Sequence, residues 1–352
     1  MSLTPIAAAE LIDRLGEFDA VIDARSEDEF AYDHLPGAVN WPTLNNAERI
    51  QIGTLYKQVN PFEARKRGAA IAARNIAAHI EREVIDQPKD WKPLAYCWRG
   101  GQRSGALSLI LSQIGFRVTL VEGGYKAFRA AMLQDIDRIV PTLHFRVVCG
   151  PTGSGKTRLL QALADQGAQV LDLEALANHR SSVLGAIPGV AQPSQKRFDM
   201  LTWETLRGFD PARPVFVESE SKKVGNLSVP TTLVEAMRQS PCLNLQLSDT
   251  QRVALLMEDY DHLVRDVDFL CDRLAVLKEL RGRMVVEGWM ALARSGQLPQ
   301  VVQDLLTQHY DPAYMASMQR NFVLFKDAIN IAPEDRSMGA MADLGTQILQ
   351  KT

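Results

Sequence analysis

Short apolar runs that end at loop residues recur along the first 125 residues of the chain. They predict buried strands at residues 19–24 (DAVIDA), 92–97 (KPLAYC) and 116–124 (FRVTLVEGG). Between the last two, residues 104–115 (SGALSLILSQIG) have helix composition and stop at a glycine. A strand, a loop, a helix and a further strand in this order predict a parallel α/β unit.

A second unit with the same alternation begins at residue 144. HFRVVCG predicts a strand, KTRLLQALADQG (156–167) predicts a helix, and PVFVESE (214–220) predicts another strand. Beyond about residue 250 the apolar pattern becomes long and helical, and we expect helices from there to the end of the chain.

The junction between the two patterns lies near residues 138–143, so we predict one domain over 1–138 and a second over 139–352. A composition of 46% hydrophobic and 23% charged residues is ordinary for a globular protein. No apolar run approaches the roughly 18 residues that a membrane span needs. The first residues, MSLTPIAAAELIDR, lack the basic start of a signal peptide. We therefore expect a cytoplasmic protein with no membrane partner.

Cysteine usage and net charge exclude some classes of protein. The four cysteines are scattered and form no CxxC pair, which argues against a zinc site and a disulfide framework, and we predict no resident metal centre. The net charge of -3 means that any nucleic-acid surface must be a local basic patch.

One loop, YCWRGGQRS, surrounds Cys97 with glycines and arginines between a predicted strand and a predicted helix. The N–H groups of such a loop can turn inward as an anion cradle. Gly100 and Gly101 permit backbone angles that other residues resist. Arg99 and Arg103 add positive charge, and this setting favours the thiolate. We predict Cys97, Arg99 and Arg103 as the catalytic residues.

Residues 21–42 (VIDARSEDEFAYDHLPGAVNWP) resemble the opening of a rhodanese domain, and Cys97 falls where rhodaneses carry sulfur as a persulfide. The spacing Cys97-x5-Arg103 is also that of cysteine phosphatases, including dual-specificity enzymes built on this fold. Sulfur or selenium transfer and phosphate-ester hydrolysis therefore both remain open. We interpret His34 in this segment as ordering a turn, not as a general base.

Residues 150–157 (GPTGSGKT) fit the phosphate-loop pattern G-x-x-x-x-G-K-[ST] and stand between a predicted strand and a predicted helix. In this motif backbone N–H groups surround a diphosphate, the lysine neutralises it, and the last hydroxyl can hold Mg²⁺. A glutamate follows the strand at 214–220 where NTPases more often have aspartate, so a diphosphate other than ATP is an open alternative. The predicted cofactor-binding residues are Gly150, Gly153, Ser154, Gly155, Lys156, Thr157 and Glu218.

The fusion of these two parts in this order resembles the tRNA 2-selenouridine synthase family. The resemblance runs from about residue 10 to about residue 325, although Ser181 stands where the family usually has glycine. It implies an N-terminal rhodanese-like domain and a P-loop NTPase-like α/β domain with a helical C-terminal region. The stretches that carry it are YCWRGGQRSGAL, LVEGGYKAFR, GPTGSGKT, LANHR, QPSQKRF, VFVESESKKVGNL and HYDPAY.

The resemblance also implies the reaction and its partners. Selenium from selenophosphate would replace the sulfur of 2-thiouridine at the wobble position (U34) of the tRNAs for lysine, glutamate and glutamine. The sulfur would first be alkylated by geranyl diphosphate to S-geranyl-2-thiouridine. Cys97 would carry selenium as a perselenide, and the phosphate loop would hold the prenyl diphosphate or a nucleotide. A selenophosphate synthetase is implied as a protein partner.

Three basic stretches then become candidate tRNA contacts, although each alone is typical of a solvated face. They lie in FEARKRGAAIAAR (62–74), SQKRF and SKKVG. The predicted nucleic-acid-binding residues are Arg65, Lys66, Arg67, Arg74, Lys196, Arg197, Lys222 and Lys223.

Two other functions compete with this hypothesis. The first is a rhodanese-fold cysteine phosphatase or sulfurtransferase with an appended nucleotide-binding domain. The second is not an enzyme but a nucleotide-gated binding module in which Cys97 is incidental.

Overall fold

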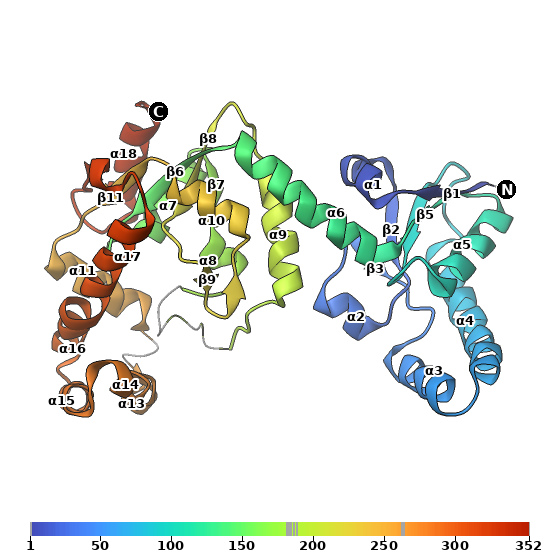
Figure 1. Cartoon of the computed structure of the whole chain (residues 1–352), viewed down its shortest axis with the longest axis horizontal. Coiled ribbons are helices and arrows are strands. Elements are labelled where there is room, and N and C mark those ends of the chain that lie inside the picture. Colours follow the sequence, from blue (N-terminus) through green and yellow to red (C-terminus); the bar gives the residue numbers. More distant parts are fainter. Residues whose placement is uncertain (1, 181–184, 186, 188, 262–264, 352) are drawn as a thin grey trace. The chain divides into compact units, whose positions relative to one another are not determined.

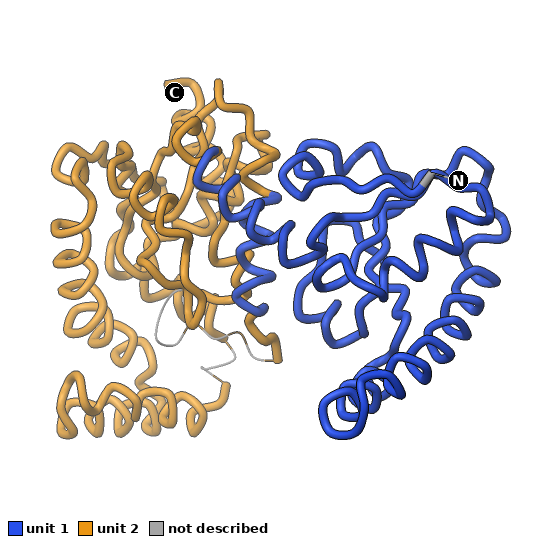
Figure 2. The backbone as a smooth tube through the Cα atoms, turned by 45° about the vertical axis from the view of Figure 1, so that its right-hand side comes forward, with its two compact units in different colours: residues 1–138, 193–204 blue, residues 139–192, 205–352 orange. Residues whose placement is uncertain are grey.

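The computed structural model describes residues 2–180, 185, 187, 189–261 and 265–351. The chain forms two compact units, which Figure 2 colours separately. One comprises residues 1–138 together with 193–204, and the other comprises 139–192 and 205–352. A short segment from the second half of the chain therefore belongs to the first unit, a return that the sequence-based division at 138/139 does not include.

The first unit contains a sheet of five parallel strands in the order β1-β5-β4-β2-β3 (Figure 1). The strands expected at 19–24, 92–97 and 116–124 are present as β2, β4 and β5. The edge strands β1 and β3 escaped prediction because their exposed positions interrupt any apolar run. The strands are β1 (Ser2–Ile6), β2 (Ala20–Asp23), β3 (Ala38–Asn40), β4 (Pro93–Tyr96) and β5 (Arg117–Val121).

Helices surround this sheet. The helix expected at 104–115 is α5, and its Leu107 and Leu111 are fully buried in the core beside Ile22. The helix α3 has no buried residue and packs against α4, so this pair is largely exposed. The helices are α1 (Ala8–Arg14), α2 (Glu27–Tyr32), α3 (Asn46–Gln58), α4 (Pro61–Glu83), α5 (Gln102–Ile114) and α6 (Gly124–Ile139).

The second unit also contains five parallel strands, in the order β12-β11-β6-β8-β7. The strands expected from residue 144 and at 214–220 are present as β6 and β8. The strands are β6 (His144–Cys149), β7 (Gln169–Leu171), β8 (Pro214–Glu218), β11 (Cys242–Leu245) and β12 (Ile329–Ile331). A two-stranded antiparallel ribbon adds β9 (Lys223–Val224) and β10 (Leu227–Ser228).

The helix expected at 156–167 is α7 (Lys156–Asp165). The region beyond residue 250 is mainly helical, as expected, but it also contains the strand β12. The sequence pattern did not reveal this strand because its three residues are too few to show a strand period. Gly282, with φ of 84°, ends α14, and Gly296, with φ of 81°, lies in the turn after α15. The remaining helices are α8 (Leu173–Leu176), α9 (Gln195–Arg207), α10 (Thr231–Arg238), α11 (Asp249–Asp259), α13 (Val267–Ala275), α14 (Lys278–Arg281), α15 (Arg283–Arg294), α16 (Leu298–Leu305), α17 (Asp311–Asn321) and α18 (Met338–Leu349).

Both sheets place functional loops at the carboxyl ends of parallel strands, the usual position of ligand sites in such folds. Cys97 follows β4, and Gly150 follows β6 next to the end of β8. Across the residues that the structure describes, we find no helix with both the length and the apolar character needed to cross a bilayer.

Candidate active sites

The Cys97 loop closes around the sulfur atom. Cys97 directly follows the last residue of β4, and it is only 3% exposed. Its Sγ accepts hydrogen bonds from the Gly101 amide at 3.2 Å and from the Ser104 hydroxyl at 3.1 Å. Two donors aimed at one sulfur stabilise negative charge on it. Sequence reasoning missed Ser104, whose only signal was its position in the first turn of the helix that follows the loop.

Glycines let the loop pack against the turn between β5 and α6. Gly124 has φ of 58°, and a Cβ there would stand 2.2 Å from the Cys97 carbonyl oxygen. Gly100 has φ of 65°, as the sequence predicted. Gly101 has an ordinary φ of −96°, so the prediction of an unusual angle there is wrong. What Gly101 contributes is its amide N–H.

The two arginines of the loop differ in their surroundings. Arg103 forms an ion pair with Glu29, with 2.6 Å between Nη1 and Oε2, and Arg49 reaches the same carboxylate at 3.0 Å. Burial raises the pKa of Glu29, but its contacts with Arg103 and Arg49 outweigh this, and the pKa is lowered. The charge of Arg103 is thus balanced by Glu29. Arg99 is exposed. Their catalytic roles stay predictions.

The rhodanese-like opening acts as the frame of this loop. Asp23 and Arg25 form a fully buried ion pair at 2.6 Å, and Arg25 also donates to the Asp33 carbonyl oxygen at 2.6 Å. The Tyr125 hydroxyl donates to the Asp33 carboxylate at 2.6 Å, and its amide donates to the Cys97 carbonyl at 2.8 Å. These contacts link the opening segment to the cysteine.

His34 has the structural position that the sequence suggested. Its Nδ1 lies 2.9 Å from the Phe30 carbonyl oxygen, and its ring stacks on the Phe30 ring at 4.1 Å between centroids. Both contacts are local and order the turn after α2.

The segment 193–204 brings a lysine to the Cys97 loop. The Lys196 ammonium lies 4.8 Å from the ring centroid of Trp98 and 5.5 Å from those of Tyr32 and Tyr125. Arg197, its neighbour, is half-buried. The segment folds back onto the first unit, and the predicted contact of these two residues with tRNA stays a prediction.

In the second unit the phosphate loop joins β6 to α7. The Lys156 ammonium donates to the Gly150 carbonyl oxygen at 2.8 Å, and the Gly150 amide donates to the Tyr314 hydroxyl at 2.6 Å. Gly153 and Gly155 both have positive φ, at 77° and 89°. Ser154 is fully buried within the loop.

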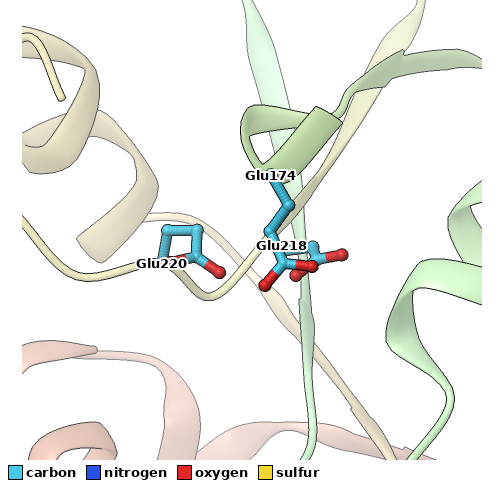
Figure 3. Close-up of side chains that lie close together, drawn as sticks. All are labelled: Glu174, Glu218 and Glu220. Atoms are coloured by element: carbon cyan, nitrogen blue, oxygen red, sulfur yellow. The ribbon is translucent and has the colours of Figure 1, made fainter. Parts of the chain in front are cut away.

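Carboxylates gather beside Thr157. Glu174, Glu218 and Glu220 have ligand atoms within 4.8 Å of one another, and Figure 3 shows the three side chains together. The Thr157 hydroxyl donates to Glu218 at 3.2 Å. Burial, followed by the charges of Glu174 and Glu220, raises the pKa of Glu218 well above the ordinary value. Oxygen ligands of this kind suit Mg²⁺. Sequence reasoning found Glu218. It missed Glu174, which comes from the short helix α8, and its predicted set did not include Glu220.

A pocket of about 520 Å³ extends from the phosphate loop and the carboxylates. Arg252 braces its edge by donating twice to the Thr152 carbonyl, at 3.0 and 2.8 Å, and by pairing with Asp311 at 2.6 Å. Apolar and aromatic side chains also line this pocket. They include Leu255, Leu256, Tyr260, Tyr310, Tyr314, Met318 and Phe322. The pocket can therefore accept a phosphorylated ligand with an apolar portion.

The LANHR stretch also reaches this pocket. Arg180 lines it, and its guanidinium lies 4.9 Å from the centroid of the Tyr260 ring. Ser181, which departs from the family pattern, lies outside the described residues.

The other predicted tRNA contacts are exposed. Arg65, Lys66 and Arg67 lie together near the start of α4, and Arg74 lies further along it. Two of these four have nearby acids: Lys66 pairs with the neighbouring Glu63, and Arg74 reaches Glu48 at 3.8 Å. Lys222 and Lys223 are exposed at the start of the two-stranded ribbon in the second unit.

A cysteine loop on one parallel sheet and a phosphate loop on another define a two-part protein that joins rhodanese-like and P-loop classes. Comparison with known families agrees: the rhodanese-like domain matches residues 7–131, and the tRNA 2-selenouridine synthase AAA domain matches residues 143–270. The resemblance and the fold class inferred from the sequence are thereby confirmed.

Individual relatives extend this match over most of the chain. The tRNA 2-selenouridine synthase of Alcanivorax borkumensis is 30% identical, over 87% of this chain and 92% of that protein. That of Marinobacter nauticus is 31% identical, over 84% and 87%. That of Nitrosomonas europaea is 36% identical, over 68% of this chain and 63% of that protein. The chain belongs to the tRNA 2-selenouridine synthase family.

Proposed function

We propose that this protein replaces the sulfur of 2-thiouridine at the tRNA wobble position with selenium from selenophosphate. The observation that carries the proposal is the Cys97 sulfur, buried at the end of β4 under two hydrogen-bond donors, in a chain of this family. A thiol held in this way is suited to sulfur or selenium chemistry. The substrate class is taken from the names of the relatives. We also propose that the protein acts in the cytoplasm.

The reaction is proposed to run through S-geranyl-2-thiouridine. In the first half, the carbon–oxygen bond of geranyl diphosphate breaks, diphosphate leaves with the electron pair, and a carbon–sulfur bond forms on the base. In the second half, the selenium of selenophosphate forms a bond to the base carbon, the carbon–sulfur bond of the base breaks, and geranylthiol leaves. Water then releases phosphate from the selenium, so no oxidant or reductant is needed.

The phosphate-loop pocket is proposed to serve the first half. Its polar end offers Lys156 to a diphosphate whose negative charge grows as it leaves, and a preformed cation lowers the cost of that charge. Its apolar wall offers room for a prenyl chain in the same cavity. Thr157, Glu174 and Glu218 would hold Mg²⁺, which when bound would neutralise part of the diphosphate charge.

The Cys97 loop is proposed to serve the second half, with Cys97 required for delivery of selenium. Arg65, Lys66, Arg67 and Arg74 of α4 are proposed to contact tRNA phosphates, because they are exposed and close in sequence. A selenophosphate synthetase is proposed as the supplier of the donor.

The test supplies the purified protein with thiolated tRNA, geranyl diphosphate, Mg²⁺ and selenophosphate, and identifies the nucleosides by mass spectrometry. We expect 2-selenouridine from the wild type and none from Cys97→Ser. Cys149→Ser, Cys242→Ser and Cys271→Ser are matched controls, and we expect them to retain activity. Hydrolysis of phosphate monoesters without any selenium in tRNA would favour the phosphatase alternative. Full selenation by Cys97→Ser would remove Cys97 from the mechanism.

A further inference from the structure

The ammonium of Lys196 is held by aromatic rings beside the Cys97 loop. It lies 4.8 Å from the ring centroid of Trp98 and 5.5 Å from each of the centroids of Tyr32 and Tyr125. Trp98 and Tyr125 stack on each other at 5.3 Å. An ammonium over aromatic faces is attracted by their negative quadrupoles, so the side chain has a defined position.

Contacts on both sides of Lys196 fix the segment that carries it. The Ser194 hydroxyl donates to the Tyr32 carbonyl oxygen at 2.6 Å. Arg129 donates to the Lys196 carbonyl oxygen at 3.2 Å and pairs with the Asp199 carboxylate at 2.5 Å. The lysine is therefore placed by backbone contacts that do not involve its own ammonium.

No described carboxylate lies within ion-pair distance of this ammonium. In the part of the chain that the structure describes, Lys196 forms no ion pair, and its ammonium lies over the three rings. Burial and the neighbouring Arg129 lower the pKa of Lys196, while the charge of Asp33 acts in the opposite direction. The Asp33 carboxylate is instead engaged by the Tyr125 hydroxyl. A partly dehydrated cation of this kind gains most from an anionic ligand.

The rings that hold the ammonium belong to the frame of the cysteine loop. Trp98 is the residue after Cys97, and its carbonyl accepts from the Lys126 amide at 3.1 Å. The Tyr125 amide donates to the Cys97 carbonyl oxygen at 2.8 Å. The ammonium and the sulfur are thus set by the same group of residues.

We propose that Lys196 is an anion-binding residue of the Cys97 site, where its ammonium takes the oxygens of a small, free phosphate-type oxyanion. This inference rests on the proposed function, in which a phosphorus compound delivers selenium at this loop. A free tetrahedral anion fits a half-buried cation between rings better than a polynucleotide does, since backbone phosphates meet exposed side chains. On this proposal Lys196 binds a small anion and is not one of the tRNA contacts.

The first test compares the rates at which Cys97 reacts with iodoacetate, an anion, and with neutral iodoacetamide of similar size. Peptide mass spectrometry assigns the alkylation to Cys97. The ratio of the two rates reports the local positive charge, because the thiolate fraction affects both rates equally. We expect Lys196→Met to lower this ratio about threefold to tenfold, and Lys196→Arg to keep it. Lys92→Met is the matched control: it removes an exposed lysine at the other end of β4, and we expect an unchanged ratio.

The second test uses inorganic thiophosphate as the probe. We expect it to slow alkylation of Cys97 by iodoacetamide in the wild type and in Lys196→Arg, but not in Lys196→Met. An unchanged rate ratio in Lys196→Met would overturn the proposal. So would equal losses in both Lys196 variants, which would indicate a role in folding alone. Protection by tRNA but not by thiophosphate would assign the lysine to nucleic acid and also overturn it.

These measurements need neither selenium nor modified tRNA. A wild-type protein that makes no 2-selenouridine would contradict the proposed function, while the rate ratio and the protection by thiophosphate would still report on Lys196.

Discussion

The Cys97 loop and the phosphate loop occupy equivalent places in their own sheets. Each leaves the carboxyl end of a parallel strand and enters a helix, β4 to α5 in one unit and β6 to α7 in the other. The first closes around one sulfur atom, which belongs to a residue that is 3% exposed. The second borders a pocket of about 520 Å³. The same local geometry thus suits a single reactive atom in one unit and an extended ligand in the other.

The difference arises from the residues around each loop. Backbone and hydroxyl donors meet the sulfur of Cys97, with a lysine and aromatic rings nearby. Carboxylates and a lysine meet at the phosphate loop, and apolar side chains continue the wall. A site that stabilises a sulfur anion and a site that balances a diphosphate with cations are suited to different half-reactions. We therefore expect them to be separable by mutation.

The largest expected effect is a reciprocal loss of the two half-reactions. Lys156→Ala should reduce geranylation of thiolated tRNA by a factor of about 100 or more, because the leaving diphosphate loses its cation. It should still selenate tRNA that is supplied already geranylated. Cys97→Ala should geranylate and stop there. Mass spectrometry of the nucleosides from both variants and both starting tRNAs measures this.

A particular result would end this division of labour. If Cys97→Ala is folded and binds tRNA but fails to geranylate, the two motifs act as one composite site.

A smaller effect is expected at the hydroxyl that faces the sulfur. Ser104→Ala removes one of two donors to Cys97, and the loss of a hydrogen bond to a charged group should slow selenation about tenfold. Geranylation should be unchanged, as measured in the same assay. Ser108→Ala is the matched control, since Ser108 is buried one turn further along α5 without a hydrogen bond to its Oγ from any described residue. Equal effects of both variants would indicate a packing defect rather than a role at the sulfur.

The carboxylates of the second unit predict that its stability depends on pH. Because burial and then Glu174 and Glu220 raise the pKa of Glu218, the folded protein binds this proton more tightly than the unfolded chain does. The stabilisation is fully present below the ordinary value of 4.5 and is lost as the pH rises through the raised pKa. Without Mg²⁺, the free energy of unfolding of the second unit should fall by at most about 1.4 kcal/mol per pH unit in this range.

Denaturant unfolding at a series of pH values tests this, with probes in each unit. Glu218→Gln should flatten the dependence, and the exposed Glu279→Gln should leave it unchanged. Added Mg²⁺ should bind more tightly as the pH rises, because it needs ionised carboxylates. A wild-type slope that persists in Glu218→Gln would assign the effect to other groups.

The smallest expected effect concerns the exposed helix α4. Replacing Arg65, Lys66 and Arg67 together by glutamine should weaken tRNA binding several-fold at moderate salt. The slope of log affinity against log salt should become shallower by about 0.7 to 0.9 for each phosphate that the variant no longer neutralises. Fluorescence anisotropy with labelled tRNA at several salt concentrations measures both quantities, and Lys222→Gln with Lys223→Gln provides a comparison from the second unit. A slope that does not change would exclude α4 from the interface.

Local sequence was sufficient where the structural signal is contiguous. The buried strands β2, β4, β6 and β8 each show an apolar run, and the cysteine loop and the phosphate loop each lie within about ten consecutive residues. The cysteine with its neighbouring glycines identified the first loop, and the spacing of glycines and lysine identified the second. The apolar runs around them identified the two α/β units. Their order along the chain carried the resemblance to the family, which the comparisons confirmed.

Tertiary structure alone decided which distant side chains complete each loop. Glu29 meets Arg103 from 74 positions away, and Glu174 meets Thr157 from another strand–helix connection. Lys196 belongs by sequence to the second half of the chain, yet it lies against Trp98 because residues 193–204 return to the first unit. No local pattern encodes such pairings. They depend on the order of the strands in each sheet and on which segments pack together in the buried core.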